Sequence, residues 1–125
     1  MKIGTLKETF EDEQRVALTP ESALQLKKLG HECIIEKGAG LASGFNDAEY
    51  KTAGVAIAPS AAAVTKASDI ITKVRPPTAT EIKRLTTSKT LISFFYPSSN
   101  DELLELARAR SASIIAMDMV PRISR

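Results

Sequence analysis

The chain has 125 residues, of which 43% are hydrophobic and 26% charged, a size and balance typical of one globular domain with a single core. The net charge is only +2, and no stretch concentrates Lys and Arg, so nucleic acid is not an expected partner. No apolar run approaches the roughly 18 residues of a membrane span, and Met1 leads into a strand rather than a signal peptide. We therefore expect a cytosolic chain that does not insert into the membrane.

Strands and helices are expected to alternate along the whole chain. β-Rich runs occupy residues 2–6, 31–36, 55–58, 69–74, 90–95 and 113–119. The first helix is predicted from Thr19 as its N-cap and Pro20 at its first position, and it stops at Gly30. An alanine-rich helix is expected over residues 60–67. Three further helix starts show capping-box spacing: Asn46 with Glu49, Thr78 with Glu81, and Ser99 with Glu102, the last helix running to about Arg110.

This alternation predicts the fold class. Strands separated by helices favour an α/β domain with an open, mostly parallel sheet and helices on both faces, a flavodoxin-like or Rossmann-like three-layer domain. We expect residues 1–125 to form one such domain. Its one cysteine, Cys33, precedes two isoleucines, which indicates a core position.

The glycine-rich segment 38–44 follows a predicted strand and precedes a helix, as the fingerprint of a dinucleotide site does. However, Ser43 stands where the third glycine belongs, and no acidic residue follows about 20 positions later to bind a ribose. We therefore favour a loop whose glycines allow positive φ angles over a cofactor site.

Three side chains near strand exits are candidates for a ligand cleft, because open α/β sheets bind ligands at the carboxyl ends of their strands. Arg15 adjoins an apolar stretch, so its guanidinium either pairs with a local acid or faces a ligand. Lys73 lies near the end of a strand, where it either serves a site or points outward to solvent. Tyr96 follows another strand, where it lines the cleft or covers the sheet edge.

The last five residues place Arg122 and Arg125 just beyond a buried strand. Two guanidinium groups at a strand exit suit phosphate or carboxylate groups, although an exposed basic tail is the alternative. The only histidine, His31, has no second histidine to form a metal site and no partners for a catalytic triad. We expect neither a metal nor a hydrolytic activity.

With these residues in view, the chain resembles the amino-terminal domain shared by alanine dehydrogenase and the NAD(H)-binding alpha subunit of proton-translocating NAD(P) transhydrogenase. The similar segments are residues 3–8, 15–20, 29–31, 36–40, 73–77 and 117–125, spread over essentially the whole chain. The resemblance implies hydride transfer between NAD(H) and NADP(H), coupled to proton movement through a membrane domain.

Two segments separate the branches of this family. Alanine dehydrogenases are similar to one another in carrying a histidine after the fifth strand, where this chain has Tyr96, so that acid/base group is missing. The ending after Pro121 is similar to the transhydrogenase signature. This implies that Arg122, Ile123, Ser124 and Arg125 belong to the NAD(H) site, and that no residue here acts as a catalytic acid or base. Arg15 and Lys73 correspond to residues that grip the substrate carboxylate in the dehydrogenase branch.

The resemblance also implies partners. These are the rest of the alpha subunit, with the family's dinucleotide-binding domain, and a membrane and NADP(H)-binding beta subunit. A homodimer at the cytoplasmic face of the inner membrane is expected, and the chain alone should be inactive. Two alternatives stay open: an alanine dehydrogenase-like or saccharopine dehydrogenase-like fragment, and a free-standing anion-binding module of flavodoxin-like fold that uses Arg15, Lys73 and Arg122.

Overall fold

The computed structural model describes residues 1–94, 102, 105–106, 109 and 113–117. All six predicted strands and the first four predicted helices are present. Of the predicted helix after Ser99, the four described residues are helical, and the rest lie outside the described part of the chain. The elements are β1 (Lys2–Thr5), α1 (Pro20–Lys28), β2 (Glu32–Glu36), η1 (Leu41–Ser43), α2 (Asp47–Thr52), β3 (Ala56–Ala58), α3 (Ala61–Ala67), β4 (Ile70–Thr72), α4 (Ala79–Lys83), β5 (Thr90–Ser93) and β6 (Ser113–Ala116).

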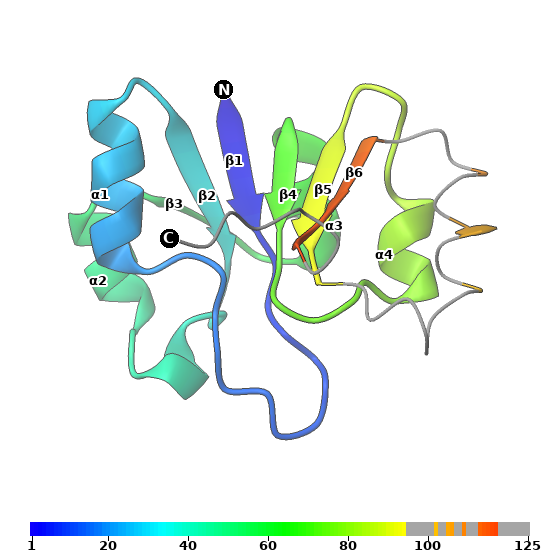
Figure 1. The fold of residues 1–125 in the computed structure, drawn as a ribbon. Coiled ribbons are helices and arrows are strands. Elements are labelled where there is room, and N and C mark those ends of the chain that lie inside the picture. Colours follow the sequence, from blue (N-terminus) through cyan, green and yellow to red (C-terminus); the bar gives the residue numbers. More distant parts are fainter. Residues whose placement is uncertain (95–101, 103–104, 107–108, 110–112, 118–125) are drawn as a thin grey trace, which may run out of the picture.

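The six strands form one sheet in the order β3-β2-β1-β4-β5-β6, and every described pair is parallel (Figure 1). At its centre, Ile3 of β1 pairs with Cys33 on one side and Ile70 on the other. This is the Rossmann-like order, which separates the fold from the flavodoxin-like alternative. The chain winds outward from β1 in one direction and from β4 in the other, so the order reverses between these two strands.

Local capping explains where the helices begin. In α1, α2 and α4 the N-cap side chain accepts a hydrogen bond from an amide three residues on, and that residue's side chain accepts one from the N-cap amide. Such boxes satisfy amide groups that have no partner inside the helix. The box of α1 uses Ser22, which the sequence pattern did not indicate because an acid or amide usually stands there. The caps are Thr19, Asn46 and Thr78, with Ser60 capping α3 by its side chain alone.

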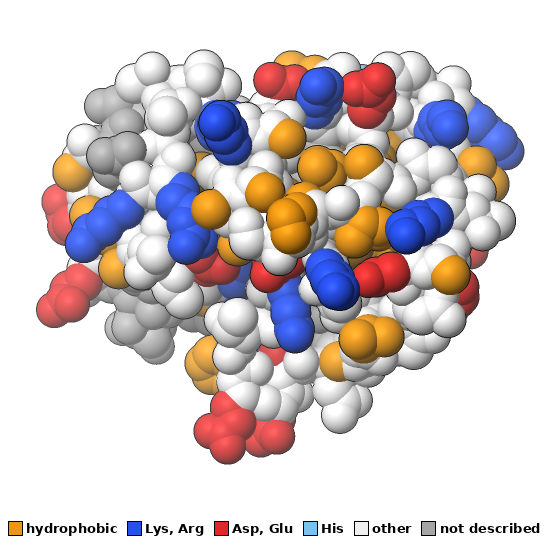
Figure 2. Space-filling model, turned by 180° about the vertical axis from the view of Figure 1, so that it is seen from behind, with side chains coloured by type: hydrophobic (Ala, Val, Ile, Leu, Met, Phe, Trp, Pro, Cys, Tyr) orange, Lys and Arg blue, Asp and Glu red, His pale blue; other side chains and the backbone are white. Residues whose placement is uncertain are grey.

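Helices cover both faces of the sheet, as predicted, and each face has its own core (Figure 1). The first cluster joins Ile35 of β2 to Tyr50 of α2, and the second joins Ile71 of β4 to Val64 of α3. Hydrophobic side chains gather over the middle of the α3 side, with Lys and Arg around them (Figure 2). The single cysteine is buried and free, as expected.

The glycine segment is a tight loop, as favoured above. Gly38 and Gly44 have φ angles of 76° and 89°, and the three-residue helix η1 lies between them. The amide of Gly38 donates to Asp47 Oδ1 over 3.0 Å. A Cβ on Gly40 would lie 2.5 Å from the Tyr50 ring, so this glycine makes room for a core side chain rather than for a phosphate.

Candidate functional site

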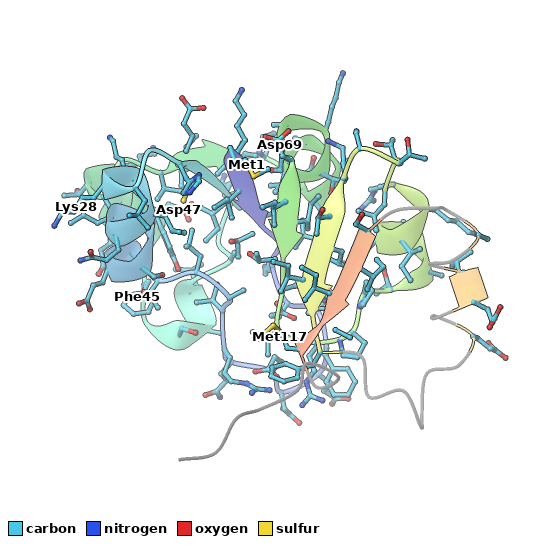
Figure 3. The ribbon with its side chains drawn as sticks, turned by 45° about the horizontal axis from the view of Figure 1, so that its top comes forward. Met1, Lys28, Phe45, Asp47, Asp69 and Met117 are labelled. Carbon is cyan, nitrogen blue, oxygen red and sulfur yellow. The ribbon has the colours of Figure 1, made fainter. Side chains whose placement is uncertain are left out.

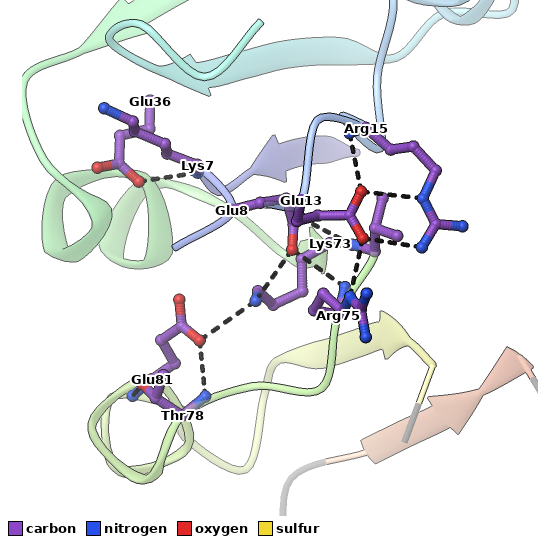
Figure 4. A network of polar contacts seen from close by, with 10 residues as sticks. Lys7, Glu8, Glu13, Arg15, Glu36, Lys73, Arg75, Thr78 and Glu81 are labelled. Atoms are coloured by element: carbon purple, nitrogen blue, oxygen red, sulfur yellow. Dashed lines mark hydrogen bonds and ion pairs between the residues drawn. The ribbon is translucent and has the colours of Figure 1, made fainter. Parts of the chain in front are cut away.

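The exits of β1 and β4 are neighbours at the carboxyl edge of the sheet, where the strand order reverses. Chain segments leave these two strands in opposite directions, which opens a crevice in doubly wound sheets. Lys7 and Glu8 lie just beyond β1, and Lys73 to Arg75 just beyond β4. The charged side chains of these exits meet those of the loop before α1 and the start of α4 (Figure 4). We call this group the switch-point network and define it as Glu8, Glu13, Arg15, Lys73, Arg75 and Glu81.

Lys73 is the buried centre of the switch-point network. Its side chain is 2% exposed, and its Nζ lies 3.3 Å from Glu8 Oε1 and 3.5 Å from Glu81 Oε1. Glu8 also accepts hydrogen bonds from the amides of Val74, over 2.7 Å, and Arg75, over 3.0 Å. A buried ammonium is tolerated only when carboxylates and hydrogen bonds replace its water. The outward-facing alternative for Lys73 is therefore wrong.

Glu81 links the network to a helix start. Its Oε1 accepts the Thr78 amide over 2.7 Å, which closes the capping box of α4, and the same oxygen faces Lys73. The carboxylate thus stabilises the amino end of the helix and the buried ammonium at once. This connection fixes where α4 begins relative to β4.

Glu13 gathers two arginines in the loop before α1. Arg15 donates from Nε over 3.0 Å and from a terminal nitrogen over 2.8 Å, and Arg75 Nε donates over 2.8 Å. These bonds, those of Arg15 first, hold the pKa of Glu13 well below its ordinary value, against the opposing effect of burial. The guanidinium carbon of Arg75 lies 4.2 Å from the centre of the Phe10 ring, a cation–π contact. Of the two alternatives for Arg15, the structure shows pairing with a local acid.

Charge in the switch-point network is balanced, with three cations and three carboxylates. Sequence reasoning singled out Arg15 and Lys73 but missed the three glutamates and Arg75. A usable signal was present in Glu8, which lies three residues beyond the end of β1, just as Lys73 lies immediately beyond β4. The pairing itself joins positions more than 60 residues apart, such as Glu8 and Val74, and no local pattern carries that information.

Ser93 adds a buried polar group at the end of β5. Its hydroxyl has no hydrogen-bond partner among the described residues, and its backbone lies beside Lys73, whose amide donates to Ile92 O over 3.1 Å. Tyr96, Arg122, Ile123, Ser124 and Arg125 lie outside the described residues, so their assignment stays a prediction.

No group of His, Cys, Asp and Glu among the described residues could hold a metal ion, and no helix in that part of the chain is long and apolar enough to cross a membrane.

The strand order defines a Rossmann-like α/β domain, and the switch-point network lies at the edge where open sheets of this kind bind ligands. Residues 4–125 match the family described as Alanine dehydrogenase/PNT, N-terminal domain, and the chain belongs to that family.

Relatives from both branches are similar to this chain. It is 59% identical, over its full length, to NAD(P) transhydrogenase subunit alpha of Cereibacter sphaeroides, and it spans 24% of that protein. Identity to the alanine dehydrogenase of Halomonas elongata is 33%, covering 96% of the chain and 32% of that protein. The crystal structure of transhydrogenase from Sinorhizobium meliloti matches with a TM-score of 0.92 at 35% identity, covering 99% of this chain and 37% of that one. The chain therefore spans about a quarter to a third of these relatives.

Proposed function

We propose that this chain is the cleft-forming N-terminal part of the alpha subunit of an NAD(P) transhydrogenase. The complete enzyme would transfer hydride between NAD(H) and NADP(H) and couple the transfer to proton translocation. The observation that carries the proposal is the full-length identity of 59% to a transhydrogenase alpha subunit, against 33% to an alanine dehydrogenase.

The backbone amide groups at the strand exits support the proposal that a different part of the longer subunit binds the phosphates of the cofactor. Lys7 donates its amide to Glu36, Gly38 donates to Asp47, and Val74 and Arg75 donate to Glu8. Carboxylates thus occupy these amides, which are the groups that bind phosphate in dinucleotide sites. We infer that another domain binds the pyrophosphate of NAD(H), and that residues 1–125 form one cleft wall, which is inactive alone.

The residues of this chain would bind and orient the cofactor. When bound, NAD(H) itself supplies the hydride, so the chain needs no catalytic acid or base. Arg122, Ile123, Ser124 and Arg125 would contact the nicotinamide end, the arginines through charge-assisted hydrogen bonds. Arg15, Lys73 and Tyr96 would line the cleft, the first two within the switch-point network.

We also propose partner subunits and a cellular location for the complete enzyme. The remaining part of the alpha subunit would supply the second cleft wall, and a membrane and NADP(H)-binding beta subunit would complete the enzyme. Two alpha subunits would form a homodimer at the cytoplasmic face of the inner membrane. The transhydrogenase alpha subunits among the relatives support an assembly of several subunits.

Substitution of Arg122 tests the cofactor assignment. In the complete alpha subunit, Arg122→Ala should raise the NADH dissociation constant about five- to 150-fold, the loss of about 1–3 kcal/mol expected for a charge-assisted contact. Calorimetric titration with NADH measures this change. Arg84→Ala is the matched control, because Arg84 is exposed at the end of α4 and should leave the constant unchanged.

Equal NADH affinity in Arg122→Ala and the parent subunit would show that the terminal residues are not part of the cofactor site.

The two alternative functions predict different ligands. Saturable pyruvate binding by the complete subunit would favour the alanine dehydrogenase-like reading, which the match to that family branch keeps open. Tight binding of an inorganic anion by the 125-residue chain would favour the free-standing module.

A further inference from the structure

A hollow of about 340 Å³ opens at the amino edge of the sheet, opposite the switch-point network. It lies between the starts of β2 and β3 and the last turn of α1. Ala23, Cys33 and Val55 line its floor, and all three are buried. Its size falls at the lower end of the range for small-molecule sites, which are mostly apolar with a few polar groups.

Two ammonium groups lie at the rim of this hollow. Lys2 and Lys27 line it, and neither forms an ion pair with any residue that the structure describes. Glu32 is the acid of the lining, so the three side chains together carry one net positive charge. The amino edge of the sheet is the top edge of the molecule in Figure 2, and basic and acidic side chains are mixed along it. Met1 and Asp69 lie close together at this edge in Figure 3.

Gly54 lets the Lys27 side chain lie against the backbone. A Cβ on Gly54 would be 2.4 Å from Lys27 Nζ and 3.0 Å from its Cδ, and Gly54 has a φ angle of 84°, which disfavours any other residue. The exposed Lys27 side chain therefore packs along the segment that forms one wall of the hollow.

His31 supplies an unsatisfied polar atom in the same lining. Its Nδ1 is buried and has no hydrogen-bond partner among the described residues. Buried polar atoms without a partner are uncommon and costly, so Nδ1 would gain from a hydrogen bond to a ligand.

We propose that the hollow binds a small monoanionic carboxylate with a short aliphatic body. The carboxylate pairs with Lys27 and accepts a hydrogen bond from His31 in the tautomer that carries its proton on Nδ1. The aliphatic body covers Ala23, Cys33 and Val55. The single net positive charge of the lining favours a monoanion over a neutral or doubly charged molecule.

The test is a titration of the 125-residue chain with hexanoate at constant ionic strength, followed by amide chemical shifts in proton–nitrogen NMR spectra. We expect saturable shifts in residues 31–34 and 53–56, with a millimolar dissociation constant. Hexanol has the same alkyl chain but no charge, and inorganic phosphate has charge but no alkyl chain. Each should bind at least about fivefold more weakly than hexanoate.

Three variants sharpen the test. Lys27→Gln should weaken hexanoate binding about fivefold, whereas Lys28→Gln, its exposed neighbour outside the lining, should not change it. Ala56→Leu places a larger side chain in the hollow from an exposed position on β3 and should abolish the saturable shifts without loss of folding. The proposal is overturned by any of three results: no saturable shifts up to the solubility limit, equal affinity for hexanol, or equal losses in Lys27→Gln and Lys28→Gln.

Discussion

The ammonium group of Lys73 has almost no contact with water, and two carboxylates lie within 3.5 Å of it. In a low-dielectric interior such a charge is stable only because its partners are already in place. The net stabilisation of the fold by the intact ion pairs is therefore smaller than the free-energy penalty for removing one of the partners. At the scale of single residues, this asymmetry makes Lys73 the most sensitive position of the switch-point network.

Lys73→Ala should lower the free energy of unfolding by about 3–5 kcal/mol, because Glu8 and Glu81 would remain buried without their cation. Urea unfolding followed by circular dichroism measures the change. Lys7→Ala is the matched control, since Lys7 also follows a strand but is exposed, and its effect should stay within about 0.5 kcal/mol. Similar losses in the two variants would show that the buried pairing contributes little.

Glu13 gives the protein a predictable acid sensitivity. Hydrogen bonds from Arg15, with a further one from Arg75, hold the pKa of Glu13 below the ordinary 4.5, although burial acts in the opposite direction. A depressed carboxyl pKa means that the unfolded chain takes up the proton first. The stabilisation is therefore complete above pH 4.5 and is lost as the pH falls below it toward the lower pKa of the folded state.

Glu13→Gln should flatten the acid side of the stability profile, because an amide does not titrate. Urea unfolding at a series of pH values below neutrality measures the slope. Glu11→Gln, in the same loop but at an exposed position, should keep the parent slope. An unchanged slope in Glu13→Gln would assign the acid sensitivity to other carboxylates.

At the scale of elements, the packing of α3 on the sheet depends on one missing side chain. A Cβ on Gly4 of β1 would lie 2.0 Å from Ser68 Oγ and 2.7 Å from Val64 Cγ1. Only glycine allows this close approach between strand and helix. The alanine-rich composition of α3 serves the same purpose, since small side chains keep its backbone near the sheet.

Gly4→Ala should destabilise the fold by about 1–3 kcal/mol through overpacking, and Ser68→Ala should relieve part of that cost in the double variant. Thermal and urea unfolding of the four members of this cycle give the coupling. Gly30→Ala is the control: no atom would crowd its Cβ, but its φ of 93° is strained for alanine, so Ser68→Ala should give it no relief. Additive effects at Gly4 and Ser68 would contradict the close-approach argument.

At the scale of the whole molecule, the sheet separates two kinds of site. Its carboxyl edge carries the charge-balanced switch-point network at the reversal of strand order, and its amino edge carries the hollow around Lys27 and His31. Both sites lie at strand ends because helices cover the faces of a parallel sheet and leave its edges to loops. A cofactor at one edge and a small carboxylate at the other would not compete for the same side chains.

Much of the fold could be predicted from the sequence. Alternating apolar runs placed all six strands, and caps such as Thr78 with Glu81 placed helix starts, because hydrophobic periodicity and capping act over a few residues. The boundaries were less accurate. The strand predicted over 69–74 is Ile70–Thr72, because the amides of Val74 and Arg75 donate to Glu8 instead of to a neighbouring strand.

The sequence by itself determined the α/β class, the parallel sheet and the segments that reach its carboxyl edge. Only the tertiary structure decided the strand order, the burial of Lys73 between two glutamates, and the hollow at the amino edge. The physical reason is range: strand and helix signals are local, whereas the partners of Lys73 and the lining around Lys27 and Val55 come from segments that folding alone brings together.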